Sequence, residues 1–157
     1  MRKKSKTAVL IFACVVLALL TGYAFIGNPL VFRNNQRLQT AVTSLESETI
    51  LLNEVVPFDW DTLYTFTPYE SKAEIEKTIG FHSPSVKENN INDGMVHLLF
   101  VNDDKVVASI LGYEDQLGYS IDFSAKGEET IAFAENARFR VAKTAAGTAL
   151  TYQEETL

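Results

Sequence analysis

The sequence is poor in the residues that build covalently linked or metal-held scaffolds. It contains one cysteine, two histidines and eight glycines in 157 residues. One thiol forms no internal disulfide, and this cysteine and histidine content is too small for a structural zinc cluster. The glycine content excludes a collagen-like fibre. A folded domain of this chain must therefore rely on its own apolar core, which at this length can bury about two thirds of the unfolded surface.

Acidic residues are missing from the first part of the chain. Residues 1–26 contain no Asp or Glu, but they hold four of the 14 Lys and Arg residues. The other ten basic residues and all twenty acidic residues follow, so the remainder carries a net charge of −10. A strongly acidic domain repels phosphate backbones, so we expect no nucleic-acid partner. A basic protein is the electrostatically natural partner.

One long uncharged run lies near the N-terminus. Residues 8–26 read AVLIFACVVLALLTGYAFI, 19 residues without a charge. As a helix this run would be about 28 Å long, enough to cross the core of a bilayer. The cations of residues 1–7 favour a cytoplasmic N-terminus, and the acidic remainder would then lie outside. We therefore predict a cytoplasmic basic tail, a single-pass anchor over 8–26 and an extracytoplasmic C-terminal part.

Two processing alternatives exist for this run. Gly22 and Ala24 provide small residues at the −3 and −1 positions of a signal-peptide cleavage site, and cleavage after Ala24 would release a secreted domain. Lipidation of Cys14 would instead produce a lipoprotein. Only residues 8–13 precede Cys14 as an apolar stretch, and the bulky Phe12 stands where a small residue is usual. We therefore interpret Cys14 as an apolar residue of the membrane helix.

Residues 27–55 carry a helical pattern. Leu38, Val42, Leu45, Leu52 and Val55 are separated by four, three, seven and three residues, which suits one face of a helix. The pattern predicts a helix from about residue 31 to 55, acting either as a stalk or as a cover over a sheet.

Residues 56–143 combine strand and helix signals. Aromatic and polar residues alternate over 58–66, which predicts a half-buried strand. Ser71 and Glu74 form a capping box for a short helix that Gly80 ends. We further predict a loop at 81–94, a hairpin of 95–101 with 105–111, a loop at 112–118, a strand at 119–123, a final pair of strands at 130–134 and 137–143, and a weakly ordered tail at 144–157.

The sum of these elements predicts an α+β fold. After the transmembrane helix, a longer helix and a short helix would pack on one face of a mainly antiparallel, meandering sheet. Residues 56–143 would form the extracytoplasmic α+β domain.

No motif predicts catalysis, a metal or a cofactor. His97 lies among apolar residues of a predicted strand, and no Gly-x-Ser-x-Gly sequence is present. The run 89–94 fails as a calcium loop, because Ile91 and Phe100 stand where the third and twelfth ligands are required. We therefore expect a protein that is not an enzyme.

Acidic residues next to aromatic ones provide a candidate binding surface. Asp59 and Asp61 share one face of the predicted strand beside Trp60, and paired carboxylates near aromatic rings would also suit a sugar site. The predicted loops add tyrosines and further acids. The candidate residues are Asp59, Asp61, Tyr69, Tyr113, Glu114 and Asp115.

A set of sequence runs also resembles a known group of proteins. The set comprises Phe58-Asp-Trp-Asp, Tyr64-x-Phe-x-Pro-Tyr69, a short helix ending Ile79-Gly-Phe81, and two strands with Leu99-Phe-Val101 and Val106-Val107. It resembles uncharacterised small bacterial membrane-anchored or lipoprotein-like extracytoplasmic proteins over about residues 56–123. The resemblance implies a shared fold and location, but it carries no catalytic residue.

Three functions remain as hypotheses. The first is a membrane-anchored, extracytoplasmic acidic domain that binds a protein or envelope component without catalysis, for example as an immunity or inhibitor protein. The second is a cell-wall carbohydrate binder or hydrolase that uses Asp59, Asp61, Trp60 and Tyr69. The third is an accessory subunit of a membrane complex, with the helix at 31–55 as its docking element.

Overall fold

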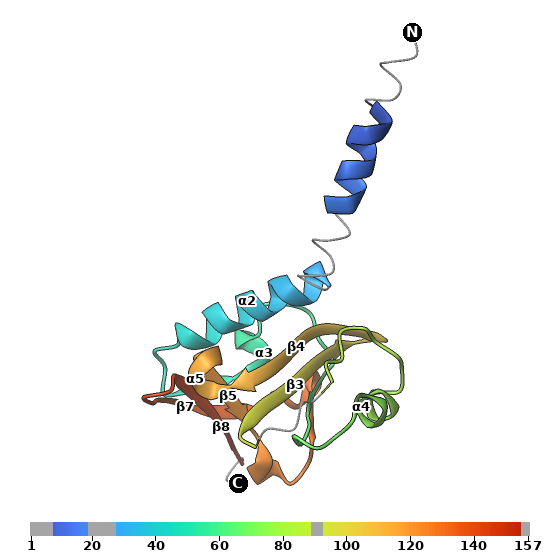
Figure 1. Cartoon of the computed structure of the whole chain (residues 1–157). Coiled ribbons are helices and arrows are strands. Elements are labelled where there is room, and N and C mark those ends of the chain that lie inside the picture. The colour runs from blue at the N-terminus through green and yellow to red at the C-terminus, as the bar shows by residue number, and fades with distance from the viewer. Residues whose placement is uncertain (1–7, 19–27, 89–92, 155–157) are drawn as a thin grey trace.

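A computed structural model describes residues 8–18, 28–88 and 93–154, and Figure 1 shows its arrangement. The helices are α2 (Pro29–Thr43), α3 (Leu52–Val55), α4 (Lys72–Ile79), α5 (Glu114–Leu117), and the 3-10 turns η1 (Ser124–Lys126) and η2 (Phe133–Glu135). The strands are β1 (Thr49–Leu51), β2 (Thr62–Thr65), β3 (Met95–Asn102), β4 (Lys105–Tyr113), β5 (Tyr119–Asp122), β6 (Thr130–Ala132), β7 (Arg138–Lys143) and β8 (Thr148–Gln153).

The strands of the described residues form two sheets of four. One has the order β1-β7-β8-β5 and the other has the order β4-β3-β2-β6. Within the described residues, β5 and β8 are the one parallel pair. The α+β class with mainly antiparallel strands is confirmed. The prediction of one meandering sheet is wrong, because strands far apart in the sequence pair with each other in each sheet.

The main core lies between the two sheets. Strands β5 and β8 bury alternate side chains, whereas β3 and β4 each bury five in succession, because α2 or α4 covers the face that the other sheet leaves open. The inner faces of the two sheets meet in one apolar cluster. Fully buried members from the strands are Leu63, Leu98, Phe100, Ala108, Ile131, Phe139 and Leu150.

Helix α2 covers one side of this core and is shorter than predicted. Asn28 caps its start, accepting a hydrogen bond from the Leu30 N–H at 3.0 Å, and the helix ends at Thr43. The predicted continuation to residue 55 is wrong, because residues 49–51 pair with β7 as strand β1. Leu38 and Val42, which define the predicted apolar face, are fully buried. Figure 1 shows α2 lying along the sheet, as a cover and not as a stalk.

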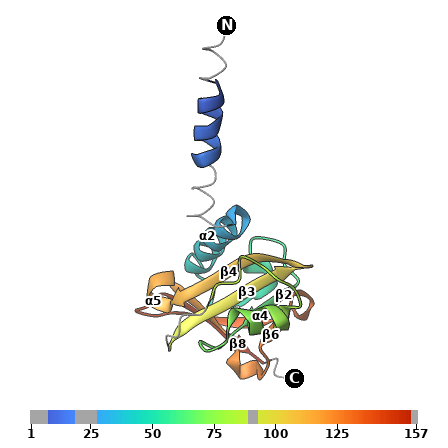
Figure 2. The same cartoon turned by 45° about the vertical axis from the view of Figure 1, so that its right-hand side comes forward.

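Helix α4 covers the opposite face of the second sheet, as Figure 2 shows. Its predicted start and end are confirmed. The Ser71 hydroxyl and the Glu74 carboxylate form the capping box, and Gly80 adopts a left-handed conformation at φ 86°. Ile75 and Ile79 pack on a smaller apolar cluster with Tyr64 and Phe66 of the β2 region. The helices therefore lie on both faces of this sheet and not on one.

Strand β2 is shorter than the predicted alternation over 58–66. It pairs with β3 on one side and β6 on the other, and both of its faces are covered. Leu63 enters the main core, whereas Tyr64 packs against the smaller cluster. The aromatic residues of this run therefore divide between two clusters.

The β3–β4 hairpin is confirmed, and its turn is formed by Asp103 and Asp104. Asp103 has a positive φ of 51°, which Asp and Asn tolerate better than most residues. Strand β4 continues to Tyr113 and is followed directly by α5, so the predicted loop at 112–118 contains a helical turn. Of the predicted loop at 81–94, residues 89–92 lie outside the described residues.

The C-terminal part departs most from the prediction. Strand β8 lies inside its sheet between β7 and β5, and Thr148 and Leu150 are buried. The prediction of a weakly ordered tail is therefore wrong for residues 148–153. The predicted pair of last strands is also wrong, because β6 pairs with β2, whereas β7 pairs with β1 and β8.

Residues 8–18 are helical and lie apart from the domain in both views (Figures 1 and 2). The predicted anchor continues through residues 19–26, which lie outside the described residues. Among the described residues, no helix has the length and apolar character needed to span a membrane.

Candidate functional site

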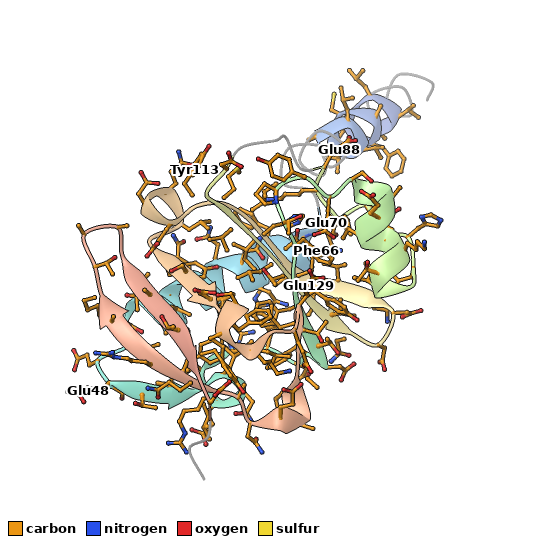
Figure 3. All side chains as sticks on the ribbon, turned by 90° about the horizontal axis from the view of Figure 1, so that it is seen from below. Glu48, Phe66, Glu70, Glu88, Tyr113 and Glu129 are labelled. Carbon is orange, nitrogen blue, oxygen red and sulfur yellow. The ribbon has the colours of Figure 1, made fainter. Side chains whose placement is uncertain are left out.

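The six candidate residues fall into two separate groups. Asp59 and Asp61 lie near the turn of the β3–β4 hairpin, where the Asp61 carboxylate contacts Asp103. Tyr113 stands at the other end of β4, and Figure 3 shows it beside α5. Eight residue steps of strand separate Lys105 from Tyr113, about 26 Å at about 3.3 Å per residue. The two groups therefore cannot form one site.

Structural roles account for much of the group at the far end of β4. The exposed Tyr69 hydroxyl donates a hydrogen bond to the Asp93 carboxylate, and this contact raises the pKa of Tyr69. Glu114 and Asp115 lie in the first turn of α5, where acidic side chains favour the helix N-terminus. Asp115 is exposed, whereas Tyr113 and Glu114 are half-buried.

A shallow hollow lies at the other end, and we call it the Phe58 hollow. Its volume is about 510 Å³. Its lining residues come from four separate parts of the chain and are Asn53, Val56, Pro57, Phe58, Asp59, Trp60, Asp61, Asn102 and Phe133. The two aspartates are at the surface, as predicted, and the structure joins them to Asn102 and to Phe133, which is more than 70 positions later.

Aromatic rings form the apolar part of the Phe58 hollow. Phe58 and Trp60 each contact Phe100 edge-on, with ring centroids 5.4 and 5.5 Å apart, and Trp60 contacts Phe133 at 5.3 Å. Such edge-to-face pairs hold the rings in fixed orientations. Phe133 remains 44% exposed and Phe58 is half-buried, so apolar surface stays open to solvent.

The two aspartates of the hollow differ in role. Asp61 is structural: its carboxylate accepts from the Asp103 N–H at 2.6 Å, and its carbonyl accepts from the Phe133 N–H at 2.7 Å. Asp59 is exposed, and its carboxylate has no hydrogen-bond or ion-pair partner among the described residues. Asp59 is therefore the charged group that is available to a partner molecule.

Trp60 and Asn53 place unpaired polar atoms in the wall of the hollow. The Trp60 ring is only 3% exposed, and its indole N–H has no hydrogen-bond partner among the described residues. The Asn53 side-chain oxygen is buried and also lacks a partner there.

The carbohydrate hypothesis requires an open Trp60 face and a convergence with Tyr69. Trp60 is buried, and Tyr69 contacts Asp93 near the start of β3, so this arrangement does not provide that convergence.

Two neighbouring hollows extend this surface toward α2. One, of about 480 Å³, shares Pro57, Phe58, Asp59 and Asn102 with the Phe58 hollow and adds Arg37 and Leu30. The next, of about 340 Å³, lies between Pro57 and the outer face of α2. Sequence reasoning missed Arg37, Asn53 and Phe133 as site residues. Arg37 and Phe133 reach this surface only through long-range packing, and Asn53 lies in α3, which the sequence pattern assigned to the preceding long helix.

The histidines lie elsewhere. His97 is 2% exposed on β3, and burial, with a smaller contribution from Lys87, lowers its pKa to about 4. Neither of its ring nitrogens has a hydrogen-bond partner among the described residues. His82 is exposed and contacts the Glu76 carboxylate at 2.7 Å, which lowers the pKa of Glu76. In the part of the chain that the structure describes, no three His, Cys, Asp or Glu side chains cluster as metal ligands do.

Comparisons with known proteins give this arrangement no family context. No protein-family model matches the chain, and neither a curated protein nor a solved structure shows significant similarity to it.

Proposed function

We propose that this chain is a membrane-anchored protein whose acidic α+β domain lies outside the cytoplasm and binds a basic segment of a protein partner, without catalysis. The Phe58 hollow carries this proposal, because it combines open aromatic surface with the unpaired carboxylate of Asp59. An immunity or inhibitor protein is one form that this function would take, and the resemblance to bacterial membrane-anchored proteins agrees with the location.

The composition of the hollow supports a protein partner. Protein interfaces are enriched in aromatic residues at their centres, and a few such anchors supply most of the binding energy. Phe58 and Phe133 provide these anchors. Trp60 contacts the Phe133 ring directly, and Trp60 and Phe58 both contact the ring of Phe100. A Lys or Arg side chain that packs on these rings would reach Asp59.

The charge of the domain supports a basic partner. Twenty acidic and ten basic residues follow residue 26, so a cationic protein is attracted from a distance as well as at contact. This long-range attraction speeds association and weakens as salt screens it.

The N-terminal residues support the membrane location. Residues 8–18 form a helix whose apolar side chains are exposed, among them Leu10 at 65% and Phe12 at 70%. Leu30 and Phe32, at the start of α2, are also about half exposed. Apolar surface of this extent is favourable against lipid and unfavourable in water.

A binding measurement on the full chain in lipid nanodiscs tests the partner chemistry. The probes are blocked octapeptides with a central Phe and either two Arg or two Glu residues, at low and high salt. We expect the Arg peptides to bind more tightly, and Asp59→Asn and Phe133→Ser each to weaken them at least fivefold. Asp115→Asn removes the same charge at the far end of β4 and serves as the control. Arg-peptide binding that Asp59→Asn leaves unchanged, or that the control weakens equally, would refute the proposal.

A protease-protection experiment tests the location. In right-side-out vesicles, added protease should degrade the domain, and in inside-out vesicles the domain should be protected. A mature chain that begins near Phe25 would instead show cleavage and secretion.

A further inference from the structure

Strand β4 is an outer strand of its sheet, and α2 covers only part of its free edge. An outer strand presents backbone N–H and C=O groups that no neighbouring strand pairs. The Asn34 side chain donates to the Val107 carbonyl at 2.9 Å. The Asn35 side chain donates to the Ser109 carbonyl at 2.8 Å and accepts from the Ser109 N–H at 3.0 Å. Asn35 thus takes the place of a neighbouring strand at Ser109.

The next outward-facing residue of β4 is Leu111. Leu111 stands opposite His97 in the β3–β4 register, and the His97 carbonyl accepts from the Phe66 N–H on the side of β2. In an antiparallel pair, two opposite residues either bond to each other through their backbone N–H and C=O groups, or both point these groups away from the partner strand. Because the backbone N–H and C=O of His97 point toward β2, the backbone N–H and C=O of Leu111 point away from β3. No described residue bonds them.

A second hollow, of about 330 Å³, lies at this section of the edge, and we call it the β4-edge hollow. Its lining residues come from α2, β4, α5, β5 and the segment after α4. The lining includes the carboxamides of Gln36, Gln39 and Gln116. Lys87 is its one charged lining residue, and it has no ion-pair partner among the described residues.

We propose that the β4-edge hollow binds an extended peptide segment that carries an acidic side chain. The backbone of one residue of that segment donates to the Leu111 C=O and accepts from the Leu111 N–H. The Asn35 carboxamide makes the same pair of hydrogen bonds with Ser109. The acidic side chain of the segment meets Lys87. Strand addition of this kind obtains affinity from backbone hydrogen bonds and selectivity from the side-chain pocket beside the edge.

This site is separate from the Phe58 hollow in place and in chemistry. The Phe58 hollow lies at the hairpin-turn end of β4 and favours a cation, whereas Leu111 lies near the other end and Lys87 favours an anion. A failure to detect binding at the β4-edge hollow therefore does not contradict the function proposed for the Phe58 hollow, and the reverse also holds.

Amide hydrogen exchange of the full chain in micelles, followed by NMR, tests the free edge. We expect the Leu111 amide to exchange at least tenfold faster than the amides of Ile110 and Gly112, which face β3. Protection of Leu111 equal to that of its neighbours would overturn the proposal, since its N–H would already be bonded.

A phage-displayed library of random octapeptides, selected on the full chain in nanodiscs, tests the occupant. We expect selected peptides to be enriched in Glu and Asp, to slow exchange at Leu111, and to bind at least tenfold more weakly to Lys87→Glu and Leu111→Pro. Proline is tolerated on an outer strand where the N–H faces outward. Lys105→Glu makes the same charge change at the exposed start of β4 and is the control.

Three results would overturn the proposal: no peptide selected, selected peptides without acidic residues, or equal binding to wild type and Lys87→Glu. Leu111→Pro counts only if its NMR spectrum shows the native fold. If it does not, binding to Lys87→Glu, a substitution at an exposed residue, tests the proposal alone.

Discussion

The Asp61 carboxylate accepts a hydrogen bond from the Asp103 N–H, 2.6 Å away, and so joins the segment before β2 to the turn of the β3–β4 hairpin. The same residue bonds through its backbone to Val101 and Phe133, each at 2.7 Å. Asp61 thus connects three parts of the wall of the Phe58 hollow.

Loss of the Asp61 side chain should therefore destabilise the domain. Asp61→Ala leaves the turn N–H without its charged acceptor, and we expect the free energy of unfolding to fall by about 1–2 kcal/mol. Urea denaturation monitored by the fluorescence of Trp60, the single tryptophan, measures the change. Asp59→Ala is the matched control and should change stability by less than about 0.5 kcal/mol. Equal effects of the two substitutions would contradict this account.

Acid should destabilise the protein through His97. Burial holds its folded-state pKa at about 4, below the usual 6.5 of the unfolded chain. As the pH falls below about 6.5, His97 binds a proton in the unfolded chain but remains neutral in the folded one. Stability is therefore intact above this pH and decreases until about pH 4, by about 3 kcal/mol in total. Urea midpoints measured from pH 7 to 4 should fall less steeply in His97→Leu. Identical slopes in both proteins would contradict the assignment.

Removal of the Asn35 side chain should expose the β4 edge. Asn35→Ala leaves the Ser109 N–H and C=O unpaired, and we expect a loss of about 1–3 kcal/mol in the free energy of unfolding. The newly open edge should also favour association between copies of the domain. Urea denaturation and analytical ultracentrifugation measure both effects, with the exposed neighbour Gln36→Ala as the control. A monomeric variant of unchanged stability would show that Asn35 has no such role.

Substitution in β8 should distinguish a strand of the core from a loose tail. Leu150 is fully buried, so Leu150→Ala creates a cavity and should cost about 2–5 kcal/mol. Thr151 is the next residue of the same strand and faces solvent, so Thr151→Ala should have little effect. Thermal unfolding followed by circular dichroism gives the comparison. Similar melting temperatures for both variants would mean that β8 does not contribute to the core.

Local signals predicted the elements whose causes are local. The Ser71–Glu74 capping box and the left-handed Gly80 define α4 from a few residues, and the two-residue turn defines the β3–β4 hairpin. The end of α2 was missed, because Leu52 and Val55 continue its apolar spacing by coincidence while residues 49–51 pair with a distant strand.

Long-range pairing was outside the reach of the sequence pattern. Thr148, Leu150 and Tyr152 do alternate with their neighbours, but small residues before them favoured an unstructured tail, and a parallel partner for β8 leaves no local signal. The candidate site shows the same limit. Asp59 and Asp61 were predicted at the surface, whereas Phe133 and Arg37 joined their neighbourhood only through the fold.

The position of β8 inside its sheet fixes when folding can finish. Strand β1 pairs with β7, which is about 90 residues later in the sequence, and β7 pairs on its other side with β8. A ribosome or a membrane channel that releases the chain from its N-terminus must therefore deliver it as far as β8 before this sheet closes. Such long-range pairing makes folding slow and leaves apolar strands open meanwhile. The chain therefore needs protection from aggregation until β8 has emerged.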